Sequence, residues 1–264
     1  MAGRSINDAL CMAMRYRELG IACSFICLME ALNHVEEFDG IIQTNQELLE
    51  GACNRGVDAH IVLDTANFRL AVHDKIAQNS ICSILYDVAH RDLVLVLDGV
   101  QSEPNGIDFV KALSHMPGCA DHVGVILYAD LYRTSADLQS LADHAVHVYL
   151  TRFPYHRKCT AVFPTGPAVT ANFIQLLMRI LRSNAPSIAV DGRDRKIVEK
   201  AMRFVLDNGL SPNLIEFHMV HGLDAELQRK LAHDGWKVRV KLPFGTESYP
   251  YVTSLFVSRL LYWP

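Results

Sequence analysis

Short apolar runs alternate with amphipathic stretches along most of the chain. Each run is almost continuously apolar, which is typical of strands buried on both faces of a parallel sheet. The runs are Ile21–Leu28, Ala59–Asp64, Leu93–Asp98, His122–Ala129, Ala145–Leu150, Ser187–Asp191, Ile215–Val220 and Lys237–Phe244. The clearest amphipathic stretches are Gln46–Arg55, Gly106–His115, Ala168–Ser183 and Arg193–Asn208. The pattern predicts strands and helices in alternation.

Strands that alternate with helices form a parallel sheet with right-handed crossovers. Eight such strands predict closure into a (β/α)8 TIM-type barrel, and the 264 residues suit one barrel of about 250 residues. A doubly wound open sheet is the alternative, but no G-x-G-x-x-G follows the first strand. We therefore expect residues 1–264 to form a single domain, with residues 1–19 as a helix that precedes the barrel.

Composition narrows the class of protein further. Half of the residues are hydrophobic, the net charge is −4, and no basic stripe interleaves with aromatic residues, so we expect no nucleic-acid partner. The seven cysteines are odd in number and include no C-x-x-C, which favours a reducing, cytoplasmic location. Arg4, Asp8 and Arg15 interrupt the first residues, so no apolar signal core is apparent, and no apolar run reaches the length of a membrane span.

Three aspartates directly end apolar runs: Asp64, Asp98 and Asp191. The carboxyl ends of barrel strands carry the active site, so these side chains are expected to meet at the barrel mouth. Each one alone is slightly better explained as a cap for the following helix. Three aspartates at equivalent strand ends favour a functional site over three separate helix caps. The other polar residues expected at strand ends are Tyr128, Asp130, Arg152, His221 and Lys241.

Aspartates and histidines also raise the question of a metal. Carboxylate and imidazole are suitable ligands, and His218 and His221 lie near the end of the seventh run. However, residues three apart on a strand point to opposite faces, and no H-E-x-x-H occurs. We predict no metal site, with His218 hydrogen-bonded to a neighbour.

Several segments resemble proline dehydrogenases, the flavin-dependent barrels that oxidise proline. They occur in the family's order and spacing between about Gly20 and Tyr251. They are Arg55-Gly56-Val57-Asp58-Ala59, Phe163-Pro164-Thr165 with Ala171-Asn172-Phe173, Ile215-Glu216-Phe217-His218 with His221-Gly222, Arg239 to Gly245, and Tyr249-Pro250-Tyr251. Each segment is a weak signal alone, and together they identify the chain as a divergent, short relative of that family.

The resemblance implies an FAD cofactor, a proline-like small-molecule substrate and an imine product of the pyrroline-5-carboxylate type. It implies catalytic roles for Asp98, at the substrate amine or orienting Lys241, and for Lys241, near the substrate carboxylate. It places Asp64 and Arg259 at the substrate. The residues that it places along the flavin are His147, Thr165, Asp191 and His218.

The chain departs from the family at many of these places. The loss of a buried charged partner for a substrate carboxylate weakens binding by ~2–5 kcal/mol. Several such losses would prevent proline from binding in the family's way. The departures are Asp64 for a lysine, Leu127 for a glutamine, His147 for an arginine, Leu150 for a lysine, Val190-Asp191-Gly192 for Thr-His-Asp/Asn, Lys241 for a tyrosine, and Ser254-Leu255 for a pair of arginines.

Three functions remain open at this point. The first is a flavoenzyme that oxidises proline or a related cyclic amine, in a specialised pathway such as carbapenem-like antibiotic synthesis. The second is a catalytically degenerate barrel with a regulatory or partner-binding role. The third is a different barrel enzyme that uses Asp64, Asp98 and Asp191 for acid–base or metal-assisted chemistry. A protein partner that covers the barrel mouth is a further expectation.

Overall fold

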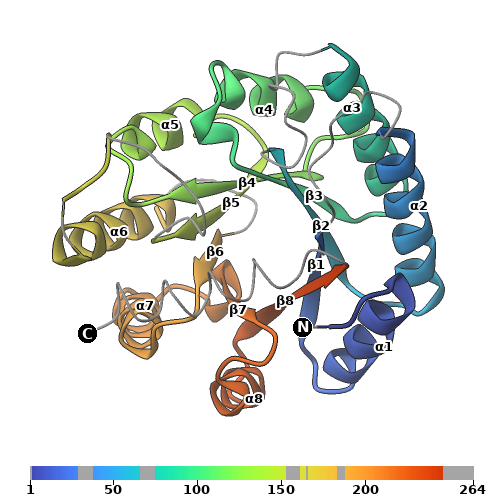
Figure 1. The fold of residues 1–264 in the computed structure, drawn as a ribbon. Helices are drawn as coiled ribbons and strands as arrows, with labels where there is room; N and C mark the ends of the chain where they lie inside the picture. Colours follow the sequence, from blue (N-terminus) through green and yellow to red (C-terminus); the bar gives the residue numbers. More distant parts are fainter. Residues whose placement is uncertain are drawn as a thin grey trace.

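Eight parallel strands form a closed barrel in chain order, β1 to β8 (Figure 1). The computed structural model describes residues 2–28, 38–65, 75–152, 161–164, 166–182 and 188–245. The strands are β1 Ala22–Leu28, β2 Ala59–Asp64, β3 Val94–Asp98, β4 Val123–Tyr128, β5 Val146–Thr151, β6 Ile188–Asp191, β7 Ile215–Val220 and β8 Lys237–Gly245. The predicted (β/α)8 barrel is confirmed, and the predicted strands agree to within a residue or two at most ends.

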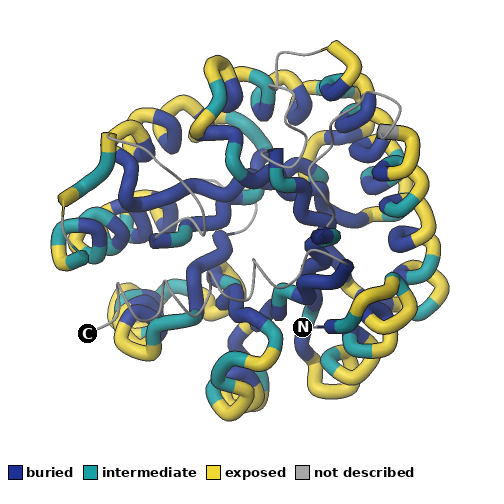
Figure 2. Tube along the Cα trace, in the orientation of Figure 1, coloured by how far each residue is buried: buried dark blue, intermediate teal, exposed yellow. Residues whose placement is uncertain are grey.

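The helices form a ring around the barrel, and their exposed residues face outward (Figure 2). They are α1 Ile6–Arg17, α2 Phe38–Asn54, α3 Lys75–His90, α4 Gly106–Ser114, α5 Thr134–Ser140, α6 Gly166–Ile180, α7 Arg195–Asp207 and α8 Ala225–His233, with 3-10 turns η3 Val100–Ser102 and η4 Pro212–Leu214. Helix α1 precedes the barrel as predicted, and Ser5 and Asp8 form a capping box at its start. Helix α2 begins at Phe38, earlier than the predicted Gln46, and buries Ile41 on the same face as Leu48.

The strands bury both of their faces, which explains their continuous apolar character. Outward side chains such as Phe25, Leu95 and Phe217 pack beneath the helices in the main core. Inward side chains such as Val96 and Ile126 form a second, smaller cluster inside the barrel. A polar residue at an inward position therefore faces the barrel interior.

The strand register sorts the inward side chains into layers that are drawn from alternate strands. One layer combines Ser24, Val96, Tyr149 and His218. The layer above it, toward the carboxyl ends, combines Val62, Ile126, Asp191 and Lys241. The layer below combines His60, Gly124, Ala189 and Arg239. The upper half of the interior thus brings together residues that lie far apart in the sequence.

Two segments of the prediction lie outside the described residues. Thr165 is one, and residues 246–264, which contain Arg259 and the predicted closing helix, are the other. The single-domain assignment for residues 1–264 therefore stays a prediction. Among the described helices, none combines the length and the apolar character that a membrane crossing requires.

Candidate active site

A cleft opens into the barrel between β4 and β8, toward the carboxyl ends of the strands. Its apolar lining includes Ile126, Ala189 and Val220. Its polar lining comes from four different strands and the loop after β6. These polar groups are Tyr149, Thr151, Asp191, Arg193, His218 and Lys241. An apolar cavity with a few convergent polar groups is the usual form of a small-molecule site.

Asp191 at the end of β6 is held as a carboxylate by Arg193. Arg193 donates from Nε to Oδ1 at 2.8 Å and from Nη2 to Oδ2 at 2.5 Å. Thr151 donates a further hydrogen bond to Oδ2 at 3.1 Å. Burial alone would raise the pKa of Asp191, but the charges of Arg193 and Arg152 outweigh it and lower that pKa. This part of the cleft is therefore polar but nearly neutral.

Lys241 on β8 is the cation of the cleft that has no counter-ion among the described residues. Within the described part of the chain it makes no ion pair and no hydrogen bond. It is partly exposed and belongs to the same layer of inward side chains as Asp191. An ammonium group in this position can bind an incoming anion, because no carboxylate of the described residues neutralises it.

Asp98 and Asp64 end the neighbouring strands β3 and β2 and are register partners. Asp98 is buried and accepts a hydrogen bond from the Tyr128 hydroxyl through Oδ1. The Thr65 hydroxyl donates to the Asp98 backbone carbonyl at 2.9 Å and fixes the strand end. The two carboxyl groups thus lie on one wall of the mouth, formed by β2 and β3.

A charged pair closes the interior below the cleft. Arg239 binds both oxygens of Glu216, with Nε at 2.8 Å from Oε1 and Nη2 at 3.2 Å from Oε2. It also donates to the Cys23 carbonyl at 2.8 Å and to Asp58 at 3.0 Å. Burial alone would raise the pKa of Glu216, but Arg239 and then His218 outweigh it and lower that pKa strongly. Glu216 is therefore a fixed anion inside the barrel.

Three aromatic side chains connect this pair to the cleft. His218 Nε2 lies 2.5 Å from Glu216 Oε1, and the Tyr149 hydroxyl lies 2.5 Å from His60 Nδ1. The Tyr149 and His218 rings meet edge to face, with centroids 4.6 Å apart. Burial lowers the pKa of His218, and Glu216 opposes that change only in part. His218 is therefore neutral near pH 7, with its Nε2 hydrogen directed to Glu216.

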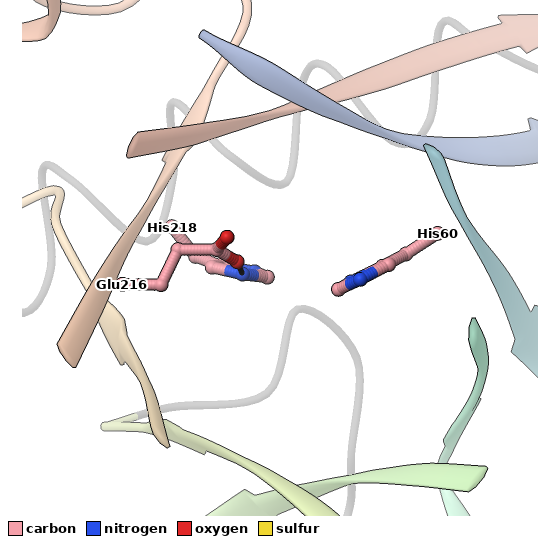
Figure 3. A group of neighbouring side chains, drawn as sticks. All are labelled: His60, Glu216 and His218. Atoms are coloured by element: carbon pink, nitrogen blue, oxygen red, sulfur yellow. Dashed lines mark hydrogen bonds and ion pairs between the residues drawn. The ribbon is translucent and has the colours of Figure 1, made fainter. Parts of the chain in front are cut away.

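His60, Glu216 and His218 place three potential metal-ligand atoms within 4.8 Å of one another (Figure 3). Both oxygens of Glu216 are already bound by Arg239, however, and one also accepts from His218. A metal ion would have to displace those donors and share a buried space with the Arg239 cation. The donor set therefore suits a hydrogen-bonded network better than a metal, and the absence of a metal site stays a prediction.

The structure brings some of the predicted site residues together. Asp191, His218 and Lys241 line the cleft, and Asp64 and Asp98 lie on the neighbouring wall. His147 faces the interior near its amino end, where Nε2 lies 2.6 Å from the Asp121 carbonyl, and it is absent from the cleft lining. The predicted places of His147 and Thr165 beside a flavin, and of Arg259 at the substrate, stay predictions.

Sequence reasoning missed several inward polar groups: Ser24, His60, Tyr149, Arg193 and Arg239. A signal was present for most of them. Alternate residues along a strand face the same side, so the inward-facing residues of one strand are separated by two or four positions. His60 therefore accompanies Asp64, Tyr149 accompanies Thr151, and Arg239 accompanies Lys241. Arg193 lies in the loop after β6, where no such periodicity applies.

A closed parallel barrel with a polar cleft at the carboxyl ends of its strands has the arrangement of barrel enzymes. No protein-family model matches the sequence. Proline dehydrogenase of Deinococcus radiodurans is 34% identical over 133 residues, which cover 50% of this chain and 42% of that protein. Proline dehydrogenase 1 of Bacillus subtilis is 21% identical over 255 residues, which cover 95% of this chain and 82% of the relative.

Solved structures give the same picture of the fold. The chain matches proline utilization A (PutA) from Bdellovibrio bacteriovorus inactivated by N-propargylglycine, with a TM-score of 0.88, 15% identity, and coverage of 98% of this chain and 32% of that chain. It matches PutA from Corynebacterium freiburgense with a TM-score of 0.80 and 17% identity, over 100% of this chain and 31% of that one. The resemblance is confirmed: the chain is related to the proline dehydrogenases across most of its length. It spans under half of the Deinococcus relative and about a third of the PutA chains.

Proposed function

We propose that this barrel oxidises proline, or a closely related cyclic secondary amine, with the help of a bound flavin. The observation that carries the proposal is the distribution of charge at the mouth. Lys241 has no counter-ion among the described residues, and it shares a cleft with Asp191, whose charge Arg193 already neutralises. Relatives named proline dehydrogenase match over most of the chain.

In this proposal the substrate is held by its two charged ends. Lys241 binds the carboxylate, as a buried or partly buried ammonium–carboxylate pair. Asp98 and Asp64, on the wall formed by β2 and β3, attract the ammonium end of the incoming substrate to the mouth, before the amine settles in the cleft. The apolar lining at Ile126 and Val220 accommodates the methylene groups of the ring. This arrangement takes over the role that the family's arginine pair has for the carboxylate.

The chemistry of the cleft lining suits a flavin ring. Part of the lining is apolar, and it also carries the hydroxyl, guanidinium and imidazole groups of Thr151, Arg193 and His218. The Asp191 charge is compensated by Arg193, so it does not repel the electron-rich ring. A bound flavin supplies the two-electron acceptor that amine oxidation needs. The chain's own residues orient the amine and exclude water from it.

Flavin content and proline binding test the proposal directly. Freshly purified protein should show the visible absorption of an oxidised flavin, and that absorption should bleach when L-proline is added anaerobically. Calorimetry with L-proline should give a dissociation constant for the wild type. Colourless protein that neither takes up added FAD nor binds proline would contradict the proposal and support the partner-binding barrel instead.

The biological setting is part of the same proposal. The cysteine content favours a cytoplasmic location, and the proposal includes a role in antibiotic metabolism and a partner at the barrel mouth. A thermal-shift screen with divalent cations separates this function from metal-assisted chemistry at the aspartates. An ion present at a hundred times its dissociation constant would stabilise the protein by about 2.7 kcal/mol.

A further inference from the structure

Two buried polar atoms of the barrel interior have no hydrogen-bond partner within the described residues: His218 Nδ1 and Ser24 Oγ. Both belong to the layer of inward side chains directly beneath Lys241. Buried polar atoms normally have partners, because an unpaired one costs free energy. These two atoms therefore indicate that something enters the space beneath Lys241.

The Glu216 carboxylate determines which nitrogen of His218 carries the hydrogen. Arg239 binds both carboxylate oxygens and keeps the group ionised, so Glu216 is an acceptor only. His218 Nε2, 2.5 Å from Oε1, must then be the donor. In the neutral ring this leaves Nδ1 with a free lone pair. His218 is thus a base that is oriented by a buried anion and lines the cleft.

We propose that His218 is a catalytic residue that removes the proton from the substrate's ammonium group. This inference rests on the proposed amine oxidation. Loss of hydride from the carbon beside nitrogen requires the nitrogen lone pair, which an ammonium lacks. The N–H bond breaks, its electron pair stays on nitrogen, and the proton forms a bond to His218 Nδ1. The flavin of the proposed function is the oxidant for the later hydride transfer.

The surrounding charges support this direction of proton transfer. The imidazolium that results lies against Glu216, which stabilises it. Burial and the two cations of β8 lower the pKa of His218, so the base is unprotonated before the substrate arrives. The titratable or charged groups that face His218 are Glu216 on its own strand, Arg239 and Lys241 on β8, Asp191 on β6, Tyr149 on β5 and His60 on β2.

Nitrogen NMR of protein labelled with 15N-histidine tests the inference without measuring activity. The protein is kept chemically reduced so that proline is not consumed, and the His218 signals are assigned by their loss in His218→Gln. In the free protein we expect a hydrogen on Nε2 and none on Nδ1. Saturating L-proline should convert both nitrogens to the imidazolium form. Tetrahydrofuran-2-carboxylate, in which an ether oxygen replaces the amine, has no proton to give and should leave His218 neutral.

The outcomes separate this inference from the proposed function. If proline binds while His218 stays neutral, His218 is not the base, and the proposed function stands. If neither proline nor a related cyclic secondary amine binds, both proposals are overturned. A hydrogen on Nδ1 in the free protein also overturns the inference, whatever the ligand does.

Kinetics give an independent measure. His218→Gln should lower kcat by at least about 100-fold, since a general base typically contributes 100- to 10,000-fold. The acid limb of the pH profile should disappear with it. His122→Gln is the matched control, because His122 is a half-buried histidine that bonds the Leu93 carbonyl away from the cleft. Unchanged kcat in His218→Gln, or an equal loss in both variants, would contradict the assignment.

Discussion

The lower and upper halves of the barrel interior use charge in different ways. In the lower half, Arg239 and Glu216 are paired through both carboxylate oxygens, and the pair is largely buried. In the upper half, Lys241 has no counter-ion among the described residues and is partly exposed. Charges that satisfy one another support the fold, whereas a charge without a partner at a cleft is available to a ligand. Substitutions in the two halves should therefore affect different measurements.

The largest effect on stability is expected at the lower pair. Arg239→Met leaves Glu216 as an unpaired anion inside the barrel, which should lower the free energy of unfolding by about 3–5 kcal/mol. Chemical denaturation measures this change. Arg195→Met is the control, because Arg195 pairs with Asp224 at the surface and should show little change. Equal effects of the two variants would mean that the lower pair does not support the fold.

The opposite behaviour is expected at Lys241. Lys241→Met removes a cation that has no described partner, so stability should change little. Proline binding should weaken by about 2 kcal/mol or more, which is roughly 30-fold in the dissociation constant. Calorimetry and denaturation on the same variant separate the two quantities. A strong loss of stability with unchanged binding would place Lys241 in the structural half.

Asp191 lies at the boundary between the halves, and pH should reveal its contribution. Because its pKa is lowered in the folded protein, its stabilising effect is complete above about pH 4, the usual aspartate value, and is lost as the pH falls through the folded value. Asp191→Asn should therefore cost about 2 kcal/mol at pH 7 and progressively less in acid. Unfolding curves recorded from neutral to acidic pH measure the difference. A cost that stays constant with pH would contradict the pairing with Arg193.

The smallest effect is expected on the wall formed by β2 and β3. Tyr128→Phe removes the hydroxyl that donates to Asp98, which should cost about 1 kcal/mol of stability. Tyr86→Phe is the control, since Tyr86 is exposed on α3. Proline binding should also weaken slightly, because Asp98 becomes free to rotate. If Tyr128→Phe lost no more stability than Tyr86→Phe, the hydrogen bond from Tyr128 would not be what holds Asp98.

Part of the candidate site could be predicted from the sequence. Asp191 and Lys241 were expected at the carboxyl ends of barrel strands, and both line the cleft. The reason is that a parallel barrel gathers all its strand ends at one face. The depth of a residue is harder to predict: His147 faces the interior near the amino end, and its flavin role stays a prediction. Residues two positions apart on a strand both face inward, but they lie at different heights in the barrel.

The sequence by itself determined the barrel, because eight continuously apolar runs separated by helices have essentially one way to bury both faces of each strand. It also determined which residue types reach the interior, through the alternation of side chains along each strand. Only the tertiary structure decided their partners. Arg239 pairs with Glu216, and Lys241 has no counter-ion among the described residues, because register and stagger set the height of each side chain, and neither is encoded within a single strand.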